Sequence, residues 1–198
     1  MGHRLREAWK SPGGIFAGPV EADETFVGGK AKNMHAWKKA LLGPGGYEKV
    51  AVAGIKDQAT GKVKAKVVGQ VDGPTLKGFV KKHTAPGAAI YTDEATAYSG
   101  LPNHGTVKHA AGQYVAGDVT INGMESFWSM FKRGFVGTYH RRSPEHLSRY
   151  VAEFEGRHND RSLDTVDQMR GIVGGLEGKR LKYHELTDHP DGPAVAVR

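Results

Sequence analysis

Three carboxylates and one lysine in this chain could together bind a metal ion and a phosphate. Asp23 lies in the run VEADETF, Asp93 follows the apolar run AAIYT, and Glu125 and Lys132 lie in the run INGMESFWSMFKRGF. Mg²⁺ needs only a few carboxylates, because water and substrate phosphates supply its other oxygen ligands. The four side chains can act together only if the fold brings them to one place.

The first two acids are expected on strands. Residues 18–27 alternate loosely between apolar and polar side chains and are followed by Gly28, which predicts a strand with Asp23 near its middle. Residues 88–92 form a short, uniformly apolar run, which is typical of a buried central strand, and Asp93 follows at its C-terminal end. If these two strands pair side by side, Asp23 and Asp93 are neighbours.

The third acid is expected on a helix. Large apolar side chains recur every three or four residues, at Met124, Phe127, Phe131 and Phe135, which predicts an amphipathic helix. Glu125 lies in its first turn, and Lys132 follows seven residues later on the same face. A structural interpretation also fits, because Asn122 as N-cap and Glu125 three residues on would form a capping box. The spacing alone leaves both interpretations open, and the helix dipole favours an acid there in either case.

The remaining elements predict an α/β fold. Residues 50–57 and 62–71 read as an antiparallel hairpin, 73–84 and 143–161 as helices, 94–101 as a short helix, 106–109 as a weak strand, and 30–49 as a long basic loop. An opening meander followed by alternating helices and strands predicts a mixed five-stranded sheet, with the first three strands antiparallel and helices on its faces. Ligands of such sheets bind at strand ends.

The composition favours a polyanionic partner. The chain has 198 residues, and its 28 Lys and Arg against 21 Asp and Glu give a formal net charge of +7 and a pI near 9.5. Such an excess attracts phosphates, because each neutralised phosphate releases condensed counterions. A basic surface that binds nothing is the alternative interpretation. The run GTYHRRSPEHLSRY interleaves tyrosines with arginines, a composition suited to base stacking and phosphate contact.

Several classes of protein find no support in the sequence. The absence of cysteine excludes disulfides and thiolate metal sites, and the histidines lack the spacing of a zinc site. There is no Walker loop, dinucleotide fingerprint or Gly-x-Ser-x-Gly motif. No apolar run approaches the ~18 residues of a membrane span, and the first residues lack a secretory signal. We therefore expect a cytoplasmic protein that does not contact a membrane.

Four runs of the sequence together resemble a known family. VEADETFVGGKAKNMH, YTDEATAY, the long run from HAAGQYVAGD to EFEGRHNDR, and GKRLKY resemble, in this order, the transposase domain of bacterial insertion sequences of the IS-fifteen-ninety-five group. The resemblance implies a ribonuclease-H-like fold, and the element order read from the residues agrees with it. It also implies that Asp23, Asp93 and Glu125 are the catalytic residues and the metal ligands, followed by Lys132.

The resemblance further implies a reaction and its partners. The chain would cleave DNA strands at the ends of an insertion sequence and transfer them into target DNA, with two Mg²⁺ ions, for which Mn²⁺ can substitute, and as a homo-oligomer assembled on DNA. The residues expected to contact DNA are Lys132, Arg133, Asn122, His140, Arg141 and Arg142. Two alternatives stay open, namely an inactive transposase remnant that only binds nucleic acid, and a stand-alone ribonuclease-H-like nuclease.

The resemblance also suggests domain boundaries. We expect residues 1–17 to be the remnant of an upstream helical segment, residues 18–183 the catalytic domain, and residues 184–198 a loose tail. Relatives carry an N-terminal zinc ribbon, which a chain without cysteine lacks, so we interpret the sequence as a truncated copy. Relatives also often have His-Thr-Asn before the glutamate, where this chain has Thr120, Ile121 and Asn122.

Overall fold

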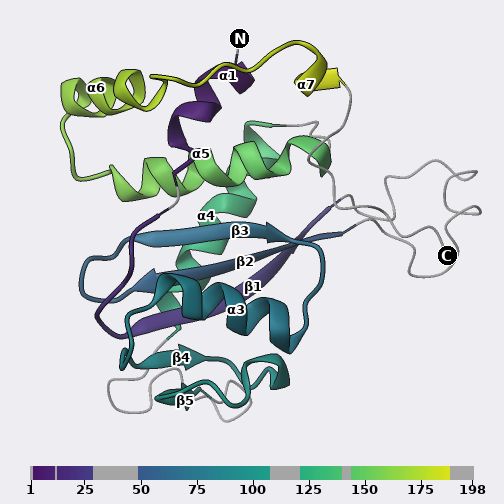
Figure 1. The fold of residues 1–198 in the computed structure, drawn as a ribbon, viewed down its shortest axis with the longest axis vertical. Coiled ribbons are helices and arrows are strands. Elements are labelled where there is room, and N and C mark those ends of the chain that lie inside the picture. The colour runs from purple at the N-terminus through teal and green to yellow at the C-terminus, as the bar shows by residue number, and fades with distance from the viewer. Residues whose placement is uncertain (1, 12, 29–48, 108–120, 140–143, 188–198) are drawn as a thin grey trace, which may run out of the picture.

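A five-stranded mixed sheet forms the centre of the molecule. The computed structural model describes residues 2–11, 13–28, 49–107, 121–139 and 144–187. The strands are β1 (Val20–Val27), β2 (Val50–Asp57), β3 (Val63–Val68), β4 (Ile90–Thr92) and β5 (His104–Thr106), in the order β3-β2-β1-β4-β5. The first three pair antiparallel, whereas β4 pairs parallel with both β1 and β5. The predicted sheet is confirmed, and its architecture is consistent with a ribonuclease-H-like fold (Figure 1).

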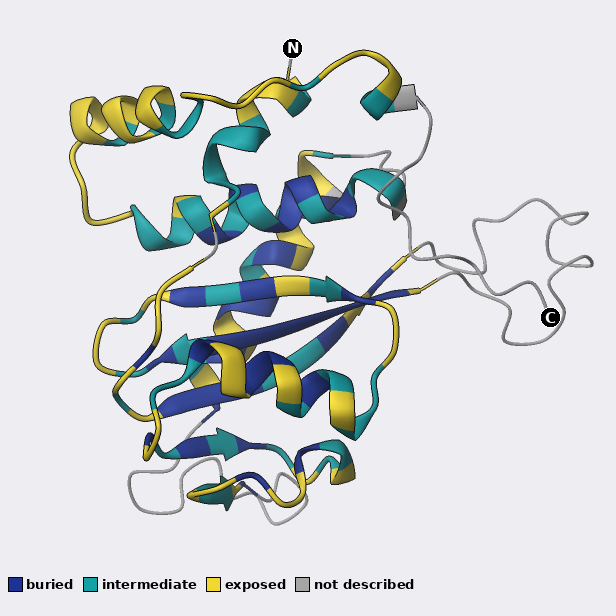
Figure 2. Ribbon diagram, viewed as in Figure 1, coloured by how far each residue is buried: buried dark blue, intermediate teal, exposed yellow. Residues whose placement is uncertain are grey.

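Helices cover both faces of the sheet. Helix α3 (Gly73–His83) packs on one face, and helices α4 (Asn122–Gly137) and α5 (Leu147–Asn159) pack on the other. Successive residues of a strand point to opposite faces, so Ala51 and Ala53 join the core under α3 while Val50 and Val52 join the core under α4 and α5. Figure 2 shows the buried residues gathered along the sheet and on the helices beside it.

Three expected elements differ from the structure. The short helix expected at 94–101 is a single 3₁₀ turn, η3 (Thr96–Tyr98), and Gly100 follows it with a φ of 84°, a conformation that glycine adopts at little cost. The weak strand lies earlier than expected, as β5. The helix expected at 143–161 begins as a 3₁₀ turn, η5 (Pro144–His146), before α5. The loop expected at 30–49 lies almost wholly outside the described residues.

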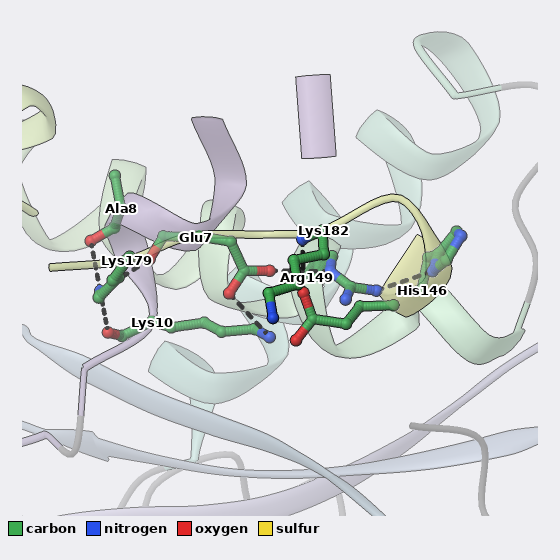
Figure 3. A network of polar contacts seen from close by, with 8 residues as sticks. Glu7, Ala8, Lys10, His146, Arg149, Lys179 and Lys182 are labelled. Carbon is green, nitrogen blue, oxygen red and sulfur yellow. Dashed lines mark hydrogen bonds and ion pairs between the residues drawn. The ribbon is translucent and has the colours of Figure 1, made fainter. Parts of the chain in front are cut away.

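The described N-terminal residues pack against α5. They form helix α1 (Gly2–Arg6) and the turn η1 (Glu7–Trp9). Arg6 Nε lies 2.7 Å from Glu153 Oε2, and Glu7 Oε1 lies 2.8 Å from Arg149 Nε. The carbonyl oxygens of Glu7 and Lys10 accept hydrogen bonds from Lys179 Nζ at 2.7 and 2.6 Å (Figure 3). Residues expected to lie outside the catalytic domain are thus joined to it by polar contacts.

Two more helices follow α5. Helix α6 (Thr165–Gly175) was not expected from the sequence, and it buries none of its residues. Helix α7 (His184–Thr187) is a single turn at the start of the expected tail. Across the described ranges, no helix is both long and apolar enough to cross a membrane.

Candidate active site

Strand β1 turns Asp23 toward the face of the sheet that α4 covers. Asp23 pairs with Gly54 of β2, and residues directly opposite each other on antiparallel strands share a face. A Cβ atom at Gly54 would lie 2.5 Å from Met124 Cε and 2.6 Å from Trp128 Cζ2, both on α4. Because Gly54 has no side chain, α4 approaches the sheet closely beside Asp23.

Strand β4 carries Asp93 to the neighbouring position. The parallel register pairs Val20 with Ile90 and Glu21 with Tyr91, so the same register continued by two residues sets Asp93 beside Asp23. Asp93 Oδ1 accepts a hydrogen bond from Ala95 N–H at 3.0 Å, which holds the carboxylate against the turn that follows β4. The expected pairing of the two strands is confirmed.

Glu125 lies in the first turn of α4, where its side chain is exposed. The capping box, one of the two interpretations left open by the sequence, does not form with Asn122 as N-cap. Ile121 occupies the N-cap position and caps no backbone group through its side chain, while Asn122 is already helical. The Met124 N–H donates to Glu21 Oε2 on β1 at 2.7 Å and also to the Ile121 carbonyl at 3.1 Å. A carboxylate from the sheet therefore takes the place of a cap from the helix itself.

The electrostatics of Asp23 join the three acids into one group. Burial, together with the charges of Glu24, Asp93 and Glu125, raises the pKa of Asp23 to about 7, although the hydrogen bond from Glu24 N–H to Asp23 Oδ1, 2.8 Å long, acts in the opposite direction. Asp93 and Glu125 are thus near enough for their charges to act on Asp23. Within the described residues, no three His, Asp or Glu side chains are close enough to hold a metal ion in common.

The donor set nevertheless suits a hard divalent cation. All three groups are carboxylates, the oxygen ligands that Mg²⁺ and Mn²⁺ prefer. The negative charge of Asp23 is disfavoured by its burial and by the neighbouring acids, and a bound cation would relieve both effects. The arrangement therefore has the charge pattern of a cation site.

The other two acids of β1 are occupied by protein donors. Glu21 is 3% exposed and accepts bonds at both oxygens, from Gln58 Nε2 at 3.1 Å and from Met124 N–H at 2.7 Å. Glu24 accepts a bond from Tyr98 Oη–H at 2.7 Å on the opposite side of the sheet, and burial raises its pKa. The sequence reasoning missed both roles, and the only signal for Glu21 was an acid between two apolar residues of a strand.

The residues expected to contact DNA are only partly described. Lys132 and Arg133 are exposed on α4, as is Asn122 at its first position, whereas Phe127 and Phe131 are buried. Glu125 and Lys132 thus share the exposed side of the helix, as expected. His140, Arg141 and Arg142 lie outside the residues that the structure describes.

A cavity of about 580 Å³ lies elsewhere, between β3, α3 and α5. Its lining includes Lys64, Lys66 and Lys82 but none of the three acids. The candidate site is therefore a surface formed by β1, β4 and the start of α4, and this cavity is not part of it.

Comparison with known proteins shows similarity to mobile-element proteins. The ISXO2-like transposase domain family matches residues 15–159, a range that includes the three acids and Lys132. A curated relative, described as an uncharacterized protein in transposable element ISH50 of Halobacterium salinarum, is 26% identical over 167 residues. The match covers 78% of this chain and 56% of the relative, so the chain spans about half the length of that protein.

Proposed function

We propose that this chain, which belongs to the family of ISXO2-like transposase domains, is the catalytic domain of a DDE transposase, cleaving DNA at the ends of an insertion sequence and transferring the cut strands into target DNA. The observation that carries the proposal is the state of Asp23. Its pKa is raised to about 7 by burial and by the charges of acids that include Asp93 and Glu125. Strongly perturbed acids of this kind cluster at functional sites.

Asp23, Asp93 and Glu125 would hold Mg²⁺, with two ions expected and Mn²⁺ as a substitute. When bound, the metal ions activate a water molecule or a 3′-hydroxyl for attack and stabilise the leaving oxygen of the phosphodiester. Without a cation, the raised pKa of about 7 leaves Asp23 partly protonated near neutral pH. Binding of a cation would therefore displace that proton.

The chain's own cations would orient the DNA. Lys132 and Arg133 lie exposed on α4, the helix that carries Glu125. Contacts from such side chains to phosphates fix the register of the DNA without reading its bases. We expect Asn122, and His140, Arg141 and Arg142, to add to this surface. Assembly of several copies on DNA is also part of the proposal.

The test uses a DNA duplex that carries a pre-cut end and a target plasmid. The wild type is expected to nick DNA and to join the pre-cut end to the plasmid, in both cases only with Mg²⁺ or Mn²⁺. Asp23→Asn and Asp93→Asn should lose both activities. Glu94→Gln is the matched control, because Glu94 is exposed beside Asp93 and is not among the main causes of the raised pKa of Asp23.

The outcomes separate the proposal from its two rivals. Metal-dependent cleavage without joined products would identify a nuclease. DNA binding without any cleavage would identify an inactive remnant that only binds nucleic acid. Loss of activity in Glu94→Gln equal to that in Asp93→Asn would remove the support for the three-acid site.

A further inference from the structure

The first turn of α4 is hydrogen-bonded to β1 and β2, two strands that lie far from it in the sequence. Glu21 of β1 accepts a hydrogen bond from Met124 N–H at 2.7 Å, across 103 positions of sequence. Lys56, which pairs with Glu21 across β1 and β2, donates from Nζ to the Gly123 carbonyl at 3.3 Å. The N-cap residue Ile121 offers no side-chain bond. In the described part of the chain, these two contacts tie the start of α4 to the sheet by hydrogen bonds.

The geometry points to Glu21 as a positioning residue that fixes Glu125 relative to Asp23, an inference that rests on the proposed function. The first N–H groups of a helix have no partner inside the helix, so its first turn frays unless something outside satisfies them. Met124 directly precedes Glu125, and its N–H donates to Glu21 at 2.7 Å as well as to the Ile121 carbonyl at 3.1 Å. Glu21 lies on the same face of β1 as Asp23, two residues away. The Glu21 carboxylate thereby joins the strand that carries Asp23 to the helical turn that carries Glu125.

The surroundings of Glu21 argue for a fixed contact. The side chain is 3% exposed, and Gln58 Nε2 donates to its second oxygen at 3.1 Å. A Cβ atom at Gly123 would lie 2.6 Å from Glu21 Oε2 and 2.8 Å from Lys56 Nζ, so an alanine there would force the two side chains of the contact to shift. Each Glu21 oxygen accepts a hydrogen bond from a protein N–H group, which favours a role in supporting the helix over a role as a metal ligand.

The test compares Mn²⁺ affinity, by calorimetry, among variants of the whole chain. Removing a group that orients metal ligands usually lowers metal affinity at least tenfold, so Glu21→Ala should weaken Mn²⁺ binding about tenfold. Glu21→Gln should weaken it by less than about threefold. The glutamine can still accept from Met124 N–H, because the amide of Gln58 can turn to accept from the new donor. Gly123→Ala breaks the same contact from the helix side and should match Glu21→Ala, which also covers the case that Glu21→Ala does not fold.

Glu155→Ala is the matched control. Glu155 is also a buried glutamate that ties a helix to a strand, accepting from Ala65 N–H at 2.9 Å and from Lys64 Nζ at 2.9 Å, but it joins α5 to β3. Its loss should lower the melting temperature and leave Mn²⁺ affinity unchanged. Hydrogen exchange at the Met124 amide gives a second readout, and it should speed up in Glu21→Ala but not in Glu155→Ala.

Four results would overturn the inference. Wild-type Mn²⁺ affinity in Glu21→Ala would show that the contact positions nothing. A loss in Glu21→Gln as large as in Glu21→Ala would make Glu21 a ligand. An equal loss in Glu155→Ala would reduce the effect to general destabilisation. If wild-type protein bound no Mn²⁺, the proposed function would fall together with this inference, whereas the first three results leave the proposed function intact.

Discussion

Replacing Asp23 by asparagine should stabilise the protein in the absence of metal ions, by an amount that grows as the pH rises from about 4 to about 7. The pKa of Asp23 is raised from 3.8 to about 7, first by burial and then by neighbouring charges. The folded state therefore binds more protons than the unfolded state between these two values, so wild-type stability falls as pH rises through this window. Well below pH 4 the side chain is neutral in both states and the raised pKa costs nothing.

The size of the effect follows from the change in pKa. A rise from 3.8 to about 7 corresponds to a cost of at most about 4 kcal/mol above pH 7. Asparagine carries no charge and can still accept the Glu24 N–H bond through its side-chain oxygen. At pH 8, Asp23→Asn should exceed the wild type by a free energy of unfolding of about 2 to 4 kcal/mol, and at pH 4 the two should be nearly equal.

Urea denaturation in EDTA at pH 4 and pH 8 measures this difference. Glu94→Gln serves as control, since it removes an exposed charge that is not among the main causes of the raised pKa of Asp23, and it should change stability by less than about 0.5 kcal/mol at either pH. The reasoning is refuted if Asp23→Asn changes stability equally at both pH values, or if it destabilises the protein at pH 8.

Three other predictions concern the same face of the sheet. Millimolar Mn²⁺ should raise the melting temperature of the wild type by mass action and release protons at pH 7, and an unmoved melting curve would count against the site. Lys132→Ala should reduce the salt dependence of DNA binding by about one phosphate contact, whereas Lys81→Ala on α3 should not; equal slopes would remove Lys132 from the interface. Gly54→Ala should destabilise the protein by about 1 to 3 kcal/mol, because the added Cβ atom would collide with Trp128. Gly78→Ala is the control: the added Cβ atom meets open space, and the variant should be more stable than the wild type by about 0.5 to 1 kcal/mol. Similar changes in the two variants, measured by urea denaturation, would contradict the close packing of α4.

The elements that position the site could be predicted because their patterns are local. The apolar residues of α4 recur with helical spacing and the hairpin alternates, so both elements follow from neighbouring residues alone. The proximity of Asp23 and Asp93 followed from placing both acids on strands that pair. Helix α6 escaped prediction because it buries no residue and contains three glycines, which leaves neither a core-facing stripe nor strong helix propensity.

The contacts that hold the site could not be predicted, because they join distant parts of the chain. Asn122 and Glu125 have the spacing of a capping box, and nothing local indicates that Glu21 satisfies the helix instead. The same holds for Tyr98 and Glu24, which are 74 positions apart. Local spacing could place each acid on its element, whereas the partner of each buried carboxylate depended on the assembled fold.

The polar contacts of the N-terminal turn with α5 and with Lys179 have a consequence for where the protein can be truncated. The family match spans residues 15–159, but Arg149 and Glu153 inside that range pair with Glu7 and Arg6 outside it. Lys179, which also lies outside that range, donates hydrogen bonds to backbone carbonyls of the N-terminal turn and of the residue after it. A fragment trimmed to the recognised domain would lose both ion pairs and would expose to water the part of α5 that the N-terminal turn contacts. We therefore expect the folding unit to extend beyond residues 15–159 at both ends. A shortened protein for expression should keep the N-terminal turn and Lys179.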